Sequence, residues 1–99
     1  MAQRIDVHPG AQSEITGALQ HYEENNLSVA EDLDKRIDAA VQLIALKPET
    51  WPAYIHGTRR YILRRFPFSL VYRESGGVIQ IIALAHHRRK PGYWKKRAG

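Results

Sequence analysis

The sequence contains no cysteine, so disulfide bonds and thiolate-ligated zinc sites are excluded. No apolar run approaches the roughly 20 residues that a membrane-spanning helix requires. Residues 1–10 also lack the apolar core of a secretory signal peptide. Acidic residues are scarce in the C-terminal two-fifths, where residues 59–97 contain one of the ten, Glu74. We therefore expect a cytoplasmic protein without a membrane anchor. In its C-terminal two-fifths, few acidic residues balance the basic ones.

Residues 59–97 contain eleven of the fifteen basic residues, so the net charge of +5 conceals a strongly divided chain. The other nine acidic residues all lie in residues 1–58. A basic surface of this kind favours an anionic partner, either nucleic acid or an acidic protein segment. We expect residues 1–58 to form the scaffold and residues 59–97 to form the working surface.

The first half of the chain predicts a strand followed by a helix. With 99 residues, the chain is long enough for one domain spanning residues 1–99. Residues 3–7 alternate in polarity, which predicts a short strand with Ile5 and Val7 facing inward. Pro9 suits the first turn of a helix, where its missing N–H has no consequence. From residue 11 onward, helical spacing places four apolar residues on one face: Ile15, Ala18, Leu19 and Tyr22.

A second helix is predicted after Asn26. Ser28 and Glu31 have the spacing of a capping box, in which each side chain bonds the backbone of the other. The apolar residues that follow keep three- and four-residue spacing, and Pro48 ends the pattern. The short connection between the two helices predicts an antiparallel hairpin.

The second half predicts strands. Residues 48–57 are too aromatic for a flexible linker and are expected to form an ordered loop. Residues 59–66, 68–74 and 78–85 have β-type composition and are separated by short turns, which predicts a three-stranded antiparallel meander. The fold class is therefore α+β with the order β-α-α-β-β-β. A helical hairpin should pack on a mainly antiparallel four-stranded sheet, followed by a basic C-terminal tail.

Four segments, in order along nearly the whole chain, resemble the RelE/ParE superfamily of toxins from bacterial type II toxin–antitoxin modules. Residues 5–11 resemble the strand-to-helix start of that family, and residues 22–24 the end of its first helix. Residues 60–73 resemble its central hairpin, and residues 86–94 its H-x-R-R-x-P-x-x-W ending. The resemblance implies a toxin that stops bacterial growth and is neutralised by a cognate antitoxin. Its target would be DNA gyrase for a ParE-like member, or mRNA on the ribosome for a RelE-like endonuclease.

The endonuclease alternative requires a general base, a general acid and cations for the phosphorane charge, with no metal or cofactor. Histidine is a common general base, which makes His87 a candidate; Arg89 can form a bidentate contact with phosphate, and Tyr93 could donate a proton. These three residues are the candidate catalytic set if the protein is a nuclease. The resemblance also places Arg89 where RelE-type nucleases have a key arginine.

Two departures from the nuclease pattern favour the ParE-like branch. RelE-like nucleases have a basic residue just before the Leu-Val-Tyr of the third strand, where this chain has Ser69. They also have paired lysines on the preceding strand, and here Arg60 matches the first while Ile62 replaces the second. The Pro91-x-x-Trp94 ending is also closer to ParE-like members.

Six residues form the predicted surface for the target or for nucleic acid, and Arg60 and Arg64 are expected on one face of a strand. The six are Arg60, Arg64, Arg73, His86, Arg88 and Trp94. Simpler roles exist for some of them, since Trp94 suits a packing anchor for the tail and either histidine could be solvated. Beyond the toxin hypothesis, the charge asymmetry alone would also suit a basic nucleic-acid-binding module. The expected assembly is a toxin–antitoxin hetero-oligomer.

Overall fold

The chain begins with a strand and two long helices. The computed structural model describes residues 3–99, with β1 at Arg4–Val7, α1 at Pro9–Asn25 and α2 at Leu27–Leu46. Pro9 lies in the first turn of α1, as predicted, and Nδ1 of His8 accepts a hydrogen bond from the Gly10 N–H at 2.9 Å. Ile5 packs against the core as expected. Val7 pairs with the core residue Ile81 and lies on the same face as Ile5, but it is 40% exposed.

The predicted capping box at the start of α2 is not formed. Asn26 is the N-cap, and its side-chain oxygen accepts hydrogen bonds from the N–H groups of Ser28 and Val29. Ser28 therefore lies inside the helix. Asparagine is as effective an N-cap as serine, and capping at Asn26 starts α2 at Leu27, two residues earlier than capping at Ser28 would. The hairpin itself is confirmed, with α1 and α2 separated by Asn26 alone.

Over residues 3–99 the sheet has five strands rather than the four that were predicted. Its order is β1-β5-β4-β3-β2, with β1 parallel to β5 and the other neighbours antiparallel. The additional strand, β2 at Ala53–Tyr54, lies between 3₁₀ turns at Pro48–Thr50 and Ile55–Gly57 in the segment predicted to be a loop. The three-stranded meander is confirmed as β3 at Thr58–Ile62, β4 at Phe68–Ser75 and β5 at Val78–His86.

β3 ends four residues earlier than predicted. After Ile62 the chain turns, with Arg65 in the left-handed region at φ 74°. The N–H of Leu63 donates to the carbonyl of Phe68 at 3.0 Å and closes this loop. Arg64 therefore lies in the loop, and the expectation that it shares a strand face with Arg60 is wrong.

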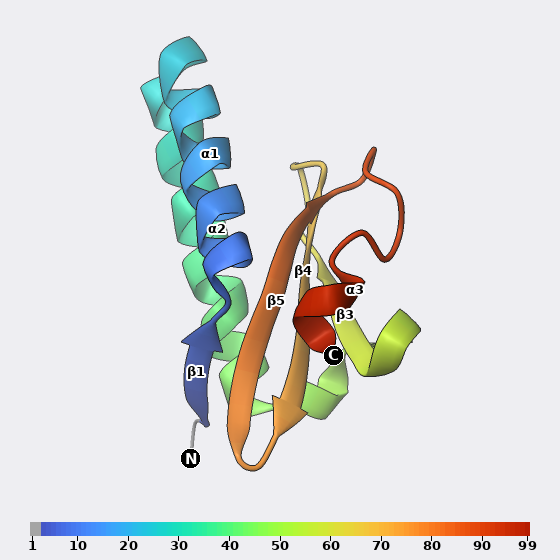
Figure 1. The fold of residues 1–99 in the computed structure, drawn as a ribbon. Helices are drawn as coiled ribbons and strands as arrows, with labels where there is room; N and C mark the ends of the chain where they lie inside the picture. Colours follow the sequence, from blue (N-terminus) through green and yellow to red (C-terminus); the bar gives the residue numbers. More distant parts are fainter. Residues whose placement is uncertain (1–2) are drawn as a thin grey trace.

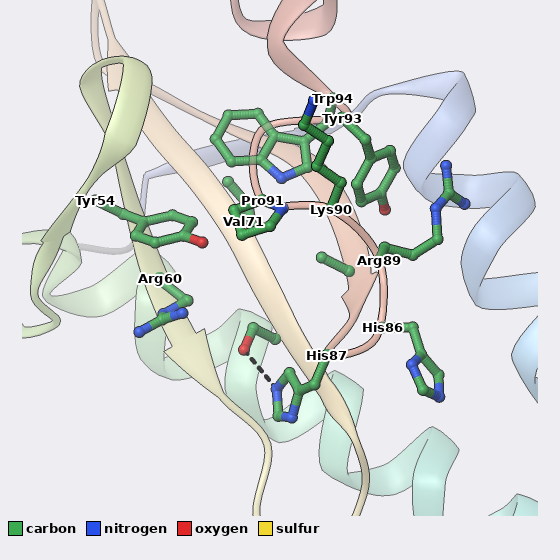
Figure 2. Close-up of a pocket in the computed structure, with 12 residues that line it drawn as sticks. Tyr54, Arg60, Val71, His86, His87, Arg89, Lys90, Pro91, Tyr93 and Trp94 are labelled. Atoms are coloured by element: carbon green, nitrogen blue, oxygen red, sulfur yellow. Dashed lines mark hydrogen bonds between the residues drawn. The ribbon is translucent and has the colours of Figure 1, made fainter.

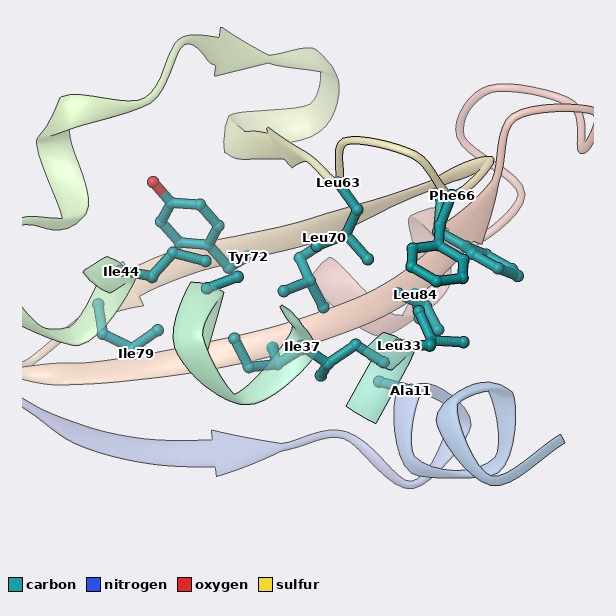
Figure 3. Packing of buried hydrophobic residues seen from close by; sticks show 13 residues of the cluster. Ala11, Leu33, Ile37, Ile44, Leu63, Phe66, Leu70, Tyr72, Ile79 and Leu84 are labelled. Atoms are coloured by element: carbon teal, nitrogen blue, oxygen red, sulfur yellow. The ribbon is translucent and has the colours of Figure 1, made fainter. Parts of the chain in front are cut away.

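The sheet is covered on both faces (Figure 1). The helical hairpin covers one face, and its main core contains α2 residues such as Leu33 and Ile37 with sheet residues such as Leu70, Tyr72 and Ile81 (Figure 3). The face of α1 predicted to be apolar also packs against this core. The C-terminal segment covers the opposite face and ends in α3 at Lys95–Ala98.

A second hydrophobic core packs the basic C-terminal tail against the sheet. It consists of Val71, Ile82, Ala83, Trp94 and Ala98. A bulge between β4 and β5 shifts the register at Val71/Tyr72, and the extra residue allows consecutive Ile82 and Ala83 to join this core. Trp94 is 1% exposed, which confirms its role as a packing anchor.

Candidate functional site

A small pocket of about 140 Å³ lies where the chain leaves β5 (Figure 2). It is lined by residues of β2, β3, β4 and β5 and by the exit segment, which we define as residues 86–94. Its lining residues are Tyr54, Arg60, Ser69, Val71, Ala85, His86, His87, Arg89, Lys90, Pro91, Tyr93 and Trp94. The lining includes three cations and two histidines but no carboxylate, so the pocket attracts anionic groups.

Backbone hydrogen bonds hold the exit segment in a defined path. The N–H of His87 donates to the carbonyl of Pro67 at 2.8 Å, and the N–H of Arg89 donates to that of His86 at 2.9 Å. Gly92 adopts a φ of 84°, which favours glycine, and this turn brings the chain back so that Trp94 enters the core. The exit segment is therefore an ordered loop whose two ends are anchored in the sheet and the second core.

Two arginines of the pocket are supported by aromatic rings. The guanidinium carbon of Arg60 lies 4.3 Å from the ring centroid of Tyr54, and that of Arg89 lies 3.9 Å from the centroid of Tyr93. These distances are in the range of cation–π contacts. Such contacts restrict the guanidinium groups while leaving their N–H donors available for a ligand.

The predicted catalytic residues are brought together, but two of them bond to other side chains. Nε2 of His87 lies 2.9 Å from the hydroxyl of Ser69, which is 2% exposed. The hydroxyl of Tyr93 donates to the carboxylate of Glu14 at 2.5 Å. Burial, and next the hydrogen bond to Glu14, raise the pKa of Tyr93 well above its ordinary value. Tyr93 is therefore a poor proton donor near neutral pH.

The remaining predicted surface residues are dispersed. Trp94 lies in the floor of the pocket and is buried, so it contributes shape rather than an exposed contact. Arg73 lies outside the pocket, where Nε donates to Gln80 and Nη1 donates to the carbonyl of Ala98. Arg88 is exposed, and its N–H donates to Nδ1 of His86 at 3.0 Å.

Arg64 belongs to a second, larger groove of about 530 Å³ between α2 and β3. Aromatic and apolar side chains line this groove together with three arginines, and Arg60 lines both cavities. The lining residues are Arg36, Ala39, Trp51, Pro52, Arg60, Tyr61, Ile62, Leu63 and Arg64. It therefore combines an apolar lining with positive charge.

The sequence analysis did not identify Glu14 or Tyr54. Glu14 lies on α1, and its carboxylate bonds Tyr93 and Arg97, which are 79 and 83 residues later in the chain. A signal was available, because Ala11, Glu14 and Ala18 share one helical face and an acid on a core-facing stripe is unusual. Tyr54 lies in the strand that was interpreted as a loop.

Within residues 3–99, no cluster of three or more histidine, aspartate or glutamate side chains is arranged to hold a metal ion. No helix in this part of the chain has the length and apolarity needed to cross a membrane.

One comparison with known proteins shows a family, and a second shows a shared fold. A family model described as "ParE toxin of type II toxin-antitoxin system, parDE" matches residues 5–91. A solved structure described as "Chromosomal ParDE TA system from P. aeruginosa" is similar with a TM-score of 0.75 and 21% sequence identity. The alignment covers 86% of this chain and 96% of that one, and at this identity it shows a shared fold. No curated protein sequence matches the chain.

Proposed function

The chain belongs to the ParE toxin family of type II toxin–antitoxin systems, and we propose that it stops bacterial growth by inhibiting DNA gyrase until a cognate antitoxin neutralises it. Gyrase inhibition is the activity that resemblance to ParE-like toxins implies. The toxin and antitoxin would form a hetero-oligomer in the bacterial cytoplasm, where gyrase acts on DNA.

The exit segment and Arg60 are the surface that we assign to target binding. His87, Arg88, Arg89 and Lys90 are exposed, and Arg60 faces the same pocket from β3. Among the described residues that line this pocket there is no carboxylate, which favours a bound anion. A gyrase–DNA complex presents anionic groups of both protein and phosphate type, which suits such a surface.

The environments of Ser69 and Tyr93 favour gyrase inhibition over RNA cleavage. The residue that RelE-like nucleases use as a cation is here Ser69, which is buried and bonds the His87 ring. The hydroxyl of Tyr93 is bonded to Glu14 and has a raised pKa. Cleavage would require a cation at the position of Ser69 and a Tyr93 hydroxyl free to donate a proton, whereas binding to gyrase requires only a stable cationic surface.

The experiment that tests this proposal adds the purified chain to DNA gyrase and relaxed plasmid and follows supercoiling. Supercoiling should fall as the chain is added and should be restored by the antitoxin. Unchanged supercoiling by a folded chain that still arrests growth would refute gyrase as the target.

A second candidate is ribosome-dependent mRNA cleavage, which one observation favours. His87, Arg89 and Arg60 all line one pocket, so a phosphate could be held beside an imidazole. Under this alternative, translating extracts containing the chain should show codon-dependent cuts in mRNA. Arg89→Ala should then abolish the cuts and leave antitoxin binding intact, because cleavage depends on phosphate stabilisation.

We assign the groove between α2 and β3 to the antitoxin. Arg36, Arg60 and Arg64 attract an acidic segment, and Trp51 and Tyr61 offer apolar surface for it to bury. An acidic segment that is disordered when free would fold as it binds. Because Arg60 also lines the pocket at the exit segment, an antitoxin in the groove would remove one cation from the target surface.

A further inference from the structure

We propose that Glu14 is a positioning residue for the target surface, which it serves by fixing Tyr93 and, through the Tyr93 ring, Arg89. The inference rests on the proposed function, in which the exit segment contacts the target. Glu14 itself lies on α1 and does not line the pocket of the exit segment.

Both carboxylate oxygens of Glu14 are occupied by groups from the C-terminal half of the chain. Oε1 accepts from Nη1 of Arg97 at 2.8 Å and from the N–H of Leu84 at 3.2 Å. Oε2 accepts from the Tyr93 hydroxyl at 2.5 Å and from Nη2 of Arg97 at 3.4 Å. The Glu14 and Arg97 side chains are 19% and 23% exposed, so water screens this pair only in part.

The start of α1 is shaped to receive the Arg97 side chain. A Cβ atom at Gly10 would lie 2.6 Å from Cζ and 2.7 Å from Nε of Arg97, so any larger residue there would displace the guanidinium. Gly10 and Glu14 are four residues apart and therefore share a helical face. Nη1 of Arg97 also donates to the carbonyl of Ile82 at 3.3 Å. One helical turn thus provides both the space and the charge that hold the C-terminal segment against β5.

Tyr93 connects this anchor to the exposed surface. Its hydroxyl bonds Glu14, and its ring lies 3.9 Å from the guanidinium carbon of Arg89 (Figure 2). Arg97 lies 5.4 Å from the same ring centroid. Releasing the hydroxyl frees the ring to rotate, and Arg89 then loses the surface against which it packs. A carboxylate 75 residues away in sequence therefore determines where an exposed arginine presents its donors.

Hydrogen exchange tests the anchor without reference to any target. Glu14→Gln keeps the size of the side chain and removes its charge, while Tyr93→Phe keeps the ring and removes the hydroxyl. Amides of residues 87–99 should exchange about tenfold faster in each variant than in the wild type. The matched control is Glu23→Gln, an exposed position on the same helix, which should exchange like the wild type. Wild-type exchange in Glu14→Gln and Tyr93→Phe would overturn the anchor.

A double-mutant cycle then separates positioning from general stability. In a protein that keeps Arg89, Glu14→Gln should raise the intracellular toxin level needed for half-maximal growth arrest about tenfold. In the Arg89→Ala background the same substitution should change potency by less than about twofold, because its effect passes through Arg89. An equal loss in both backgrounds would overturn positioning through Arg89. Failure of the wild type to inhibit gyrase would count against the proposed target alone, because growth arrest and hydrogen exchange do not depend on that choice.

Discussion

The hydroxyl of Ser69 and Nε2 of His87 lie 2.9 Å apart and join the start of β4 to the first residue after β5. Ser69 is 2% exposed, whereas His87 is exposed, so the contact ties a surface imidazole to the sheet interior. Ser69 occupies the position at which, by resemblance, RelE-like nucleases have a basic residue. The relationship predicts a structural rather than a chemical role for this serine.

Ser69→Ala should lower the free energy of unfolding by about 1 kcal/mol, because it removes one partly buried hydrogen bond. Gyrase inhibition should stay within about twofold of the wild type, since no proton transfer is involved. Urea denaturation and a supercoiling assay measure the two effects. Ser75→Ala, at the exposed end of the same strand, is the control. A large loss of inhibition in a folded Ser69→Ala variant would indicate a chemical role.

Tyr72 should make stability depend on pH in the alkaline range. Burial raises its pKa to about 12, and its hydroxyl donates to the carbonyl of Pro48. The folded state therefore keeps a proton that the unfolded state loses near pH 10. This contribution, on the order of 2 kcal/mol, is complete below pH 10 and is lost as the pH rises toward 12. In Tyr72→Phe the free energy of unfolding should fall less steeply between these values, as measured by denaturation at each pH. Identical slopes in the two proteins would contradict this assignment.

Trp94→Ala should destabilise the protein by about 3–5 kcal/mol, because it empties the centre of the second core. The exit segment would then lose its C-terminal attachment, and toxicity should fall with stability. Trp51→Ala is a useful comparison, because Trp51 is only partly buried and its substitution should lower the free energy of unfolding by less. Urea denaturation of both variants measures the difference, and equal costs would argue against Trp94 as the principal anchor.

Arg64→Glu should weaken antitoxin binding about tenfold, because it places a negative charge in the groove proposed for an acidic segment. Arg88→Glu, on the exposed exit segment, is the control and should bind the antitoxin nearly normally. Isothermal titration with a cognate antitoxin provides the affinities. Stronger weakening by Arg88→Glu than by Arg64→Glu would move the antitoxin to the exit segment.

The helices, the meander and most of the core follow from local patterns. Apolar spacing located α1 and α2, and short turns located β3, β4 and β5. The strand β2 was missed because two residues carry no periodicity. The cap at Asn26 was missed because Ser28 offered an equally good local pattern.

The site was harder to predict because its contacts join distant residues. The charge pattern located the cationic surface, but it could not separate exposed Arg88 from Arg73, whose side chain bonds Gln80 and Ala98. The helical face that Glu14 shares with Ala11 and Ala18 marks it as unusual, but its partners Tyr93 and Arg97 depend on how the C-terminal segment returns to α1. Local patterns contain no information on such pairs.

Gyrase supercoiling in the presence of the purified chain tests the central claim most directly. The wild type should inhibit supercoiling in proportion to its concentration, and Arg60→Ala and Arg89→Ala should each inhibit about tenfold less, because both cations line the proposed contact pocket. Full supercoiling activity with the wild-type chain, at concentrations that arrest growth in cells, would contradict the account.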